Sequence, residues 1–109
     1  MAKIVWTQRA IADLDAIAGY IALDKPDAAG NLIDRIKSRV KMLEKFPEAG
    51  PRIPELLPDG RFRQIVEPPC RIFYRHDRPT DQIVILAVRR GEMPFQKRLL
   101  HRRDRRTQD

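Results

Sequence analysis

The sequence has little of several residue types on which common kinds of functional site depend. Cys70 is the only cysteine among 109 residues, so no disulfide can form within the chain, and a reducing cytoplasm is the expected location. The two histidines, His76 and His101, are far apart, so neither a metal site nor another cofactor site is expected. No apolar run approaches the roughly 18 residues that a membrane span needs, and we expect no membrane partner.

Positive charge, in contrast, is in excess and unevenly placed. The chain has 22 Lys and Arg against 15 Asp and Glu, a formal net charge of +7. Residues 1–60 hold nine charges of each sign, whereas residues 61–109 hold thirteen basic and six acidic residues and therefore the whole excess. A basic half of this kind favours a polyanionic partner, which means nucleic acid, a machine that handles nucleic acid, or an acidic protein.

Hydrophobic periodicity predicts the order of elements along the chain. Thr7 is a good N-cap for a first helix, and Asp24 or Lys25 caps a second helix that begins at Pro26. The segment 46–60 holds four prolines and two glycines and is therefore a connector. The predicted elements are a strand over 3–6, helices over 8–23 and 26–46, strands over 62–66, 71–75 and 82–88, and a short helix from Pro94.

This order predicts one α+β domain over residues 1–109, with a basic tail that is flexible from about residue 101. An antiparallel helical hairpin packs on one face of a mostly antiparallel sheet, and a short helix ends the fold. In the strand "CRIFYRHD", Ile72 and Tyr74 point to the helices, with the tyrosine hydroxyl satisfied. Arg71, Phe73 and Arg75 point to the other face, which we expect to be open to water and able to bind anions.

Four stretches together resemble the RelE/ParE superfamily of toxins from bacterial toxin–antitoxin pairs. They are "WTQRAIADLDAIAGYI", "FPEAGPRIPEL", "CRIFYR" and "ILAVRRG", and the similarity runs collinearly from residue 4 to about residue 91. The resemblance implies a small basic toxin held inactive by an acidic antitoxin. RelE-like members cut messenger RNA on the ribosome, whereas ParE-like members inhibit DNA gyrase.

The residues favour the ParE-like branch. Cleavage without a metal needs a base, an acid and cations at one phosphodiester. Arg71 matches a RelE-type arginine, but Phe62 and Gln64 stand where some RelE-like members have lysines, and no tyrosine follows Tyr74. The connector "FPEAGPRIPEL" and the strand pair resemble the ParE-like pattern, although Arg90 replaces a histidine that is common there.

The resemblance therefore implies a toxin that acts by binding gyrase. Its antitoxin would have a C-terminal segment that folds on binding, and DNA would be contacted only through that antitoxin. Pairing of Arg52 with Glu55 is expected within the connector. Six arginines are the candidate contacts for target or antitoxin: Arg52, Arg63, Arg71, Arg75, Arg89 and Arg90.

Two alternatives remain open at this point. The first is a RelE-like, metal-independent endoribonuclease with an atypical arginine set, for which Arg71 and Arg90 are the candidate catalytic residues. The second is a nucleic-acid-binding domain without toxicity. Neither a recognition-helix turn nor a stacked aromatic pair on the sheet is evident in the sequence, which disfavours this second alternative.

Overall fold

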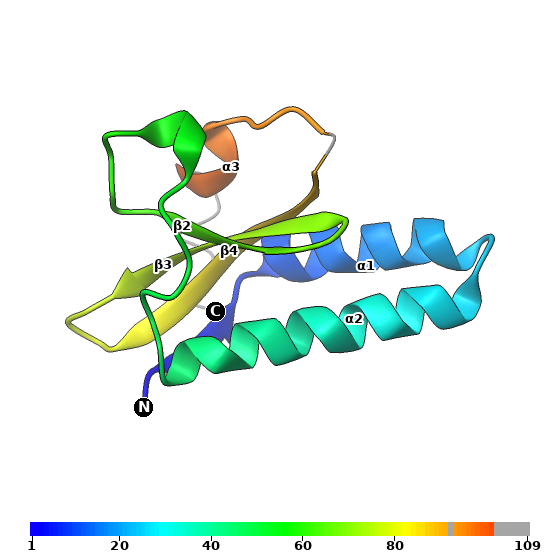
Figure 1. The fold of residues 1–109 in the computed structure, drawn as a ribbon, viewed down its shortest axis with the longest axis horizontal. Helices are drawn as coiled ribbons and strands as arrows, with labels where there is room; N and C mark the ends of the chain where they lie inside the picture. The colour runs from blue at the N-terminus through cyan, green and yellow to red at the C-terminus, as the bar shows by residue number, and fades with distance from the viewer. Residues whose placement is uncertain (92, 102–109) are drawn as a thin grey trace.

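The computed structural model describes residues 1–91 and 93–101 of the chain. The predicted order of elements is confirmed (Figure 1). The elements are β1 (Lys3–Trp6), α1 (Gln8–Ala22), α2 (Pro26–Lys41), the 3-10 turns η1 (Met42–Glu44) and η2 (Pro54–Leu56), β2 (Arg63–Glu67), β3 (Cys70–Asp77), β4 (Gln82–Arg90) and α3 (Arg98–His101).

The four strands form one mixed sheet in the order β1-β4-β3-β2. β1 pairs in parallel with β4, and the other neighbours are antiparallel, which confirms the predicted α+β class. β3 and β4 are longer than predicted. As a result Arg89 and Arg90 belong to β4, where they pair with Arg71 and Cys70 of β3.

Local sequence signals explain where the helices begin. The Thr7 hydroxyl accepts a hydrogen bond from the Ala10 amide at 3.1 Å, as predicted for an N-cap, and donates one to the Ile85 carbonyl at 2.8 Å. This residue therefore joins α1 to β4. Pro26 is the first residue of α2, where its missing N–H is not needed. α2 ends at Lys41, before the predicted end, because the chain tightens into the η1 turn.

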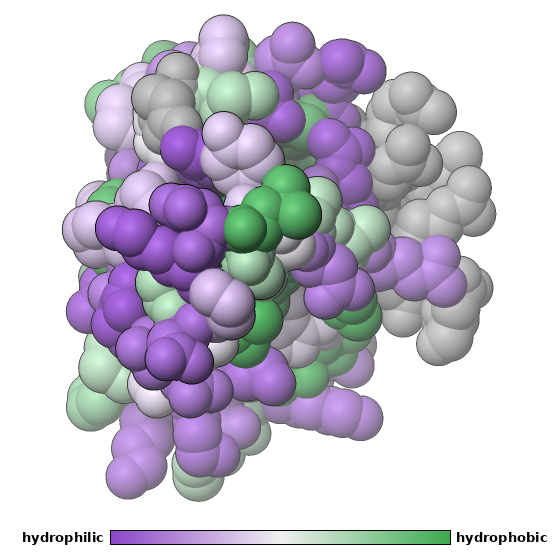
Figure 2. All heavy atoms as spheres, turned by 90° about the vertical axis from the view of Figure 1, so that its right-hand side faces the viewer, coloured by the Kyte–Doolittle hydropathy of each residue, from purple (hydrophilic) through white to green (hydrophobic). Residues whose placement is uncertain are grey.

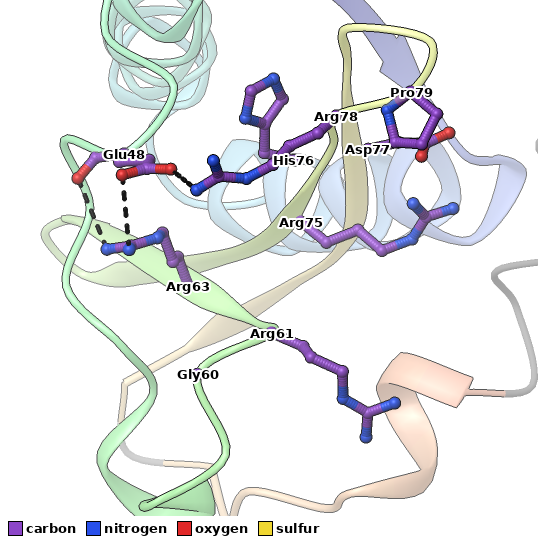
Figure 3. Close-up of a pocket in the computed structure, with 9 residues that line it drawn as sticks. All are labelled: Glu48, Gly60, Arg61, Arg63, Arg75, His76, Asp77, Arg78 and Pro79. Atoms are coloured by element: carbon purple, nitrogen blue, oxygen red, sulfur yellow. Dashed lines mark hydrogen bonds and ion pairs between the residues drawn. The ribbon is translucent and has the colours of Figure 1, made fainter.

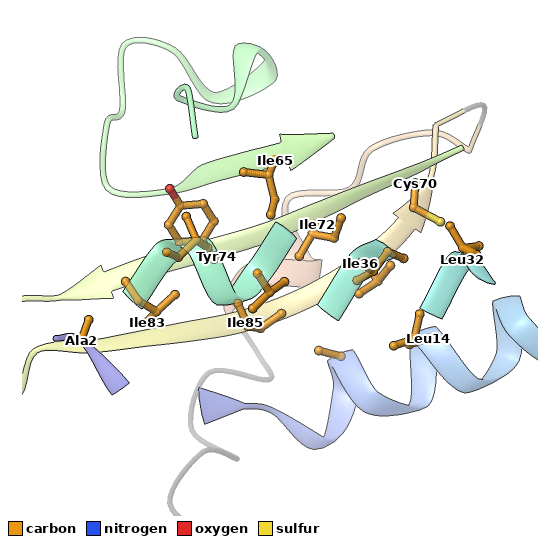
Figure 4. Close-up of a cluster of buried hydrophobic side chains, with 14 residues drawn as sticks. Ala2, Leu14, Leu32, Ile36, Ile65, Cys70, Ile72, Tyr74, Ile83 and Ile85 are labelled. Carbon is orange, nitrogen blue, oxygen red and sulfur yellow. The ribbon is translucent and has the colours of Figure 1, made fainter. Parts of the chain in front are cut away.

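The hairpin of α1 and α2 covers one face of the sheet and encloses the main core (Figure 4). Apolar residues recur along each helix at helical spacing, so that one face of each helix meets the inward side chains of β3 and β4. The buried members are Ala2, Ala10, Leu14, Leu32, Ile36, Val40, Leu43, Ile65, Cys70, Ile72, Tyr74, Ile83, Ile85 and Val88.

The opposite face of the sheet is also buried, and the expectation of a wet face is wrong there. Phe73 is fully buried, because the connector and α3 fold over it. A register shift at Phe73 and Tyr74 turns both Leu86 and Ala87 of β4 to this face. The second cluster consists of Ile53, Phe62, Phe73, Val84, Leu86, Ala87, Leu99 and Leu100.

Tyr74 ties the start of the connector to the sheet. Its buried hydroxyl donates to the Pro47 carbonyl at 2.9 Å and accepts from the Gly50 amide at 3.0 Å, so the predicted satisfaction of this hydroxyl is confirmed. Burial raises the pKa of Tyr74. Gly50 is required by this close approach, since a Cβ there would lie 2.3 Å from the Gln64 carbonyl oxygen and 2.9 Å from the Tyr74 hydroxyl.

We expect Gly50→Ala to lower the free energy of unfolding by more than about 2 kcal/mol, because backbone must move to admit the methyl group. Gly19→Ala is the matched control. Its Cβ would meet nothing within 4 Å on an exposed part of α1, so it should stabilise the fold by up to about 1 kcal/mol. Denaturant unfolding of both variants gives the two values. Equal stability of the two variants would contradict this account of the connector.

Candidate functional site

Arg71 is held on all sides by protein groups. Its guanidinium donates to both carboxylate oxygens of Glu55, at 2.7 and 3.0 Å, and to the side-chain oxygen of Gln64, at 2.7 and 2.9 Å. The side chain is only 15% exposed. The predicted Arg52–Glu55 pair is therefore wrong, since Glu55 binds Arg71. This hydrogen bond lowers the pKa of Glu55.

Two aromatic rings complete the surroundings of Arg71. Its guanidinium carbon lies 4.9 Å from the centroid of the Phe73 ring and 5.7 Å from that of Phe95. The two rings meet edge to face, with 5.4 Å between centroids. Arg71 thus connects η2, β2, β3 and the segment before α3. We call this group, Arg71 with Glu55, Gln64, Phe73 and Phe95, the Arg71 tether.

A second group of arginines surrounds a hollow at the other end of β3 (Figure 3). The hollow has a volume of about 370 Å³. Its basic residues come from the start of β2 and from the end of β3 with the turn that follows it. We call it the arginine hollow and define it by Arg61, Arg63, Arg75 and Arg78, with Glu48 and Asp77 as its acidic residues.

Arg61, Arg63 and Arg78 each have a carboxylate neighbour. Glu48 accepts a hydrogen bond from Arg78 and lies 3.9 Å from a terminal nitrogen of Arg63, which also donates to the Gly50 carbonyl at 2.8 Å. Arg61 donates to Asp59 at 2.8 Å. This hydrogen bond lowers the pKa of Asp59 to about 2.

A third group lies between α1 and the end of β4, around a hollow of about 290 Å³. We call it the β4 corner and define it by Tyr20, Val88, Arg89, Arg90 and Met93. The Arg90 guanidinium carbon lies 5.3 Å from the Tyr20 ring centroid, and Arg89 donates to the Pro94 carbonyl at 3.3 Å. Tyr20 and Met93 are 64% and 45% exposed.

On the side where α1 and α2 are joined, apolar side chains form small groups among hydrophilic ones (Figure 2).

Asp13 closes the inner edge of the β4 corner. Its carboxylate accepts the Val88 amide at 3.0 Å and pairs with Arg9 at 3.2 Å. Burial is the main cause that raises the pKa of Asp13. No sequence signal distinguishes this residue as functional, because it lies off the apolar stripe of α1. Only the tertiary structure brings it to the strand.

The six predicted arginines therefore do not form one site. Arg63 and Arg75 line the arginine hollow, Arg71 belongs to the tether, and Arg89 and Arg90 lie at the β4 corner. Arg52 is exposed in the connector and pairs through its main chain with Arg63. The basic tail over 102–109 and Glu92 lie outside the described residues.

Neither a metal site nor a membrane helix is found in the part of the chain that the structure describes. Within residues 1–91 and 93–101, no three His, Cys, Asp or Glu side chains gather as metal ligands would. No helix in these ranges is both long enough and apolar enough to cross a membrane.

Comparison with known proteins gives one consistent family. A model of the ParE toxin of the parDE type II toxin–antitoxin system matches residues 4–95. Toxin RelE2 of Caulobacter vibrioides is 46% identical over 50 residues, which are 46% of this chain and 57% of that protein. The inferred toxin Y4kP of Sinorhizobium fredii is 33% identical over 84 residues, which are 77% of this chain and 85% of that protein.

A solved structure supports the same assignment. A chain of the chromosomal ParDE toxin–antitoxin system from P. aeruginosa superposes with a TM-score of 0.70 at 29% identity. The match covers 84% of this chain and 98% of that one. The chain therefore belongs to the ParE toxin family of type II toxin–antitoxin systems, within the RelE/ParE superfamily.

Proposed function

We propose that this toxin acts in the cytoplasm by binding DNA gyrase, without cutting RNA, and that an acidic antitoxin neutralises it at the β4 corner. The proposal that the toxin does not cut RNA rests on the contacts of Arg71 within the fold. Arg71 is the residue that matches a RelE-type nuclease arginine, and its guanidinium is already bonded to Glu55 and Gln64.

The positions of the two nuclease candidates support binding over catalysis. Arg71 stacks on Phe73, on the face of the sheet that the connector and α3 cover. Arg90 stacks on Tyr20 of α1, on the face that the helical hairpin covers. Two side chains on opposite faces of a sheet cannot act on one phosphodiester, which metal-independent cleavage requires. The Tyr74 hydroxyl is also occupied, by Pro47 and Gly50.

The β4 corner has the properties that an acidic, partly apolar segment needs. Arg89 and Arg90 provide positive charge beside the exposed Tyr20 and Met93. β1 pairs with β4 only as far as Ile85, and beyond it the Val88 amide is already bonded to Asp13 of α1. An antitoxin segment that orders on binding would therefore dock through side chains, with acidic residues on the arginines and apolar residues on Tyr20 and Met93.

The target is tested with purified components. If the toxin binds gyrase and does not act on the ribosome, it should inhibit DNA supercoiling by gyrase while a reconstituted translation reaction continues. Electrophoresis of plasmid topoisomers and primer extension on ribosome-bound messenger RNA are the two measurements. Codon-positioned cuts in messenger RNA with unaffected supercoiling would move the protein to the ribonuclease alternative.

The structural role of Arg71 predicts a loss of stability. Arg71→Ala should lower the free energy of unfolding by about 2 kcal/mol, because it removes charged hydrogen bonds and leaves Gln64 and Glu55 without their partner. Inhibition per folded molecule should remain. A variant that is fully stable but inactive would show instead that Arg71 contacts the target.

The pH dependence of the same variant has a defined sign. Arg71 lowers the pKa of Glu55 in the folded protein. The contribution of this pair to folding stability is therefore fully present above the pKa of an unfolded glutamate, and it is lost as pH falls through the lower pKa of the folded state. The stability difference between wild type and Arg71→Ala should therefore narrow in acid. Arg35→Ala is the control, since its pair with Glu67 is surface-exposed and should contribute less than about 1 kcal/mol.

Antitoxin binding is expected to depend on Arg90. Arg90→Gln should weaken the complex with the co-encoded antitoxin about tenfold, because one charge-assisted contact is lost. Lys37→Gln on the exposed side of α2 removes the same charge elsewhere and should change the affinity less than twofold. Isothermal titration calorimetry measures both values. Equal weakening by the two variants would mean that only net charge matters and that the β4 corner is not the docking site.

A further inference from the structure

We propose that the arginine hollow binds the phosphodiester backbone of DNA directly. This inference does not depend on the gyrase target, and it differs from the expectation that DNA is reached only through the antitoxin. Guanidinium groups are concentrated at this place. Four arginines line the hollow, against two lining carboxylates, Glu48 and Asp77, and a third, Asp59, that pairs with Arg61 from outside the lining.

The ion pairs in the hollow are exposed and therefore easily exchanged. The side chains of Arg61 and Arg78 are 69% and 73% exposed, although each is paired with a carboxylate. Water screens such pairs and leaves them weak. A phosphate oxygen can therefore replace Asp59 or Glu48 as the hydrogen-bond acceptor of these arginines at little cost in free energy. Figure 3 shows Arg61 and Arg75 extending to one side of the hollow, away from the Glu48 end.

The chemistry of these side chains favours phosphate as the ligand. All four cations are arginines, whose planar fork of donors matches the oxygens of a phosphate. Arg63 and Arg78 lie toward the Glu48 end of the hollow, whereas Arg61 and Arg75 extend to the other side (Figure 3), so one small anion would not reach all four. A nucleic-acid strand repeats its charge about every 3.4 Å and can meet several of them in turn.

An acidic peptide fits this hollow less well. Extended peptides usually gain affinity by adding a strand to a free sheet edge. Here the outer edge of β2 next to the hollow is already paired with the connector. The main-chain amide of Gln64 donates to the Pro51 carbonyl, and the main-chain amide of Ile53 donates to the Phe62 carbonyl. Recognition must therefore come from side chains, which is how proteins hold a phosphate backbone.

An apolar hollow next to the first one bears on whether the DNA is single-stranded or duplex. Phe46, Pro47 and Ala49 line it, and it shares Glu48 and His76 with the arginine hollow. Phe46 is 61% exposed. An exposed aromatic ring beside arginines can stack with an unpaired base, but not with a base inside a duplex. Both forms present the same phosphodiester chemistry.

Fluorescence anisotropy with the full-length chain, without gyrase or antitoxin, tests the proposal. The probes are a labelled single-stranded DNA oligonucleotide and a labelled duplex of the same sequence, over a range of salt concentrations. Arg61→Gln and Arg78→Gln should each raise Kd about tenfold and reduce the salt slope by about 1. The control Lys37→Gln removes the same charge from α2 and should raise Kd less than twofold.

Two further measurements interpret the result. Loss of affinity in Phe46→Ala for the single strand alone would identify single-stranded DNA as the ligand, and equal binding by this variant would identify backbone contact without base stacking.

Equal weakening by Lys37→Gln and Arg61→Gln would overturn the proposal, because binding would then follow net charge, including that of the basic tail. Competition by polyglutamate as effective as unlabelled DNA would overturn it too, in favour of an acidic protein segment.

Discussion

Burial of both faces of the four-stranded sheet is the constraint on which the rest of this structure depends. One face is covered by the α1–α2 hairpin. The other has to be covered by a proline-rich connector and a four-residue helix, neither of which brings a regular apolar stripe. The second layer therefore needs polar attachments. Tyr74 fixes the connector where it leaves η1, and Arg71 fixes it at η2 through Glu55.

This way of covering the sheet separates the arginines by role. An arginine that points into the second layer becomes part of its construction, as Arg71 does with Phe73 and Phe95. Arginines at the two ends of the sheet remain at its rim, where the layers stop. One set forms the arginine hollow where the connector and the β3–β4 turn meet, and the other forms the β4 corner beside α1. We propose that partners bind the charge at the rim, whereas charge in the layer stabilises the fold.

The same separation is consistent with the proposal that the protein acts by binding. A catalytic cluster needs several groups around one reacting atom, and β-strand geometry places neighbouring residues on opposite faces. In this chain the arginines that sequence alone suggests as partners, Arg71 and Arg90, lie on the two sides of the sheet. The other arginines form two separate charged surfaces, the arginine hollow and the β4 corner.

Much of the fold could be predicted from the sequence, because local chemistry determines it. The Thr7 cap, the proline at the start of α2 and the period of the apolar residues depend on neighbours within a few positions. The mostly antiparallel sheet follows from short links between its strands. The four stretches that resemble the RelE/ParE superfamily likewise sufficed to indicate it.

What each arginine does was decided only by the tertiary structure. Alternation along β3 correctly placed Arg71 with Phe73, but nothing local showed that α3 would cover that face. The partner of Glu55 proved to be sixteen residues away instead of three, and Asp13 meets an amide 75 residues further along the chain. Contacts of this range depend on how the layers pack. The sequence alone determined which elements form and that the chain is basic, whereas packing determined which charges are used inside the fold and which lie at its rim.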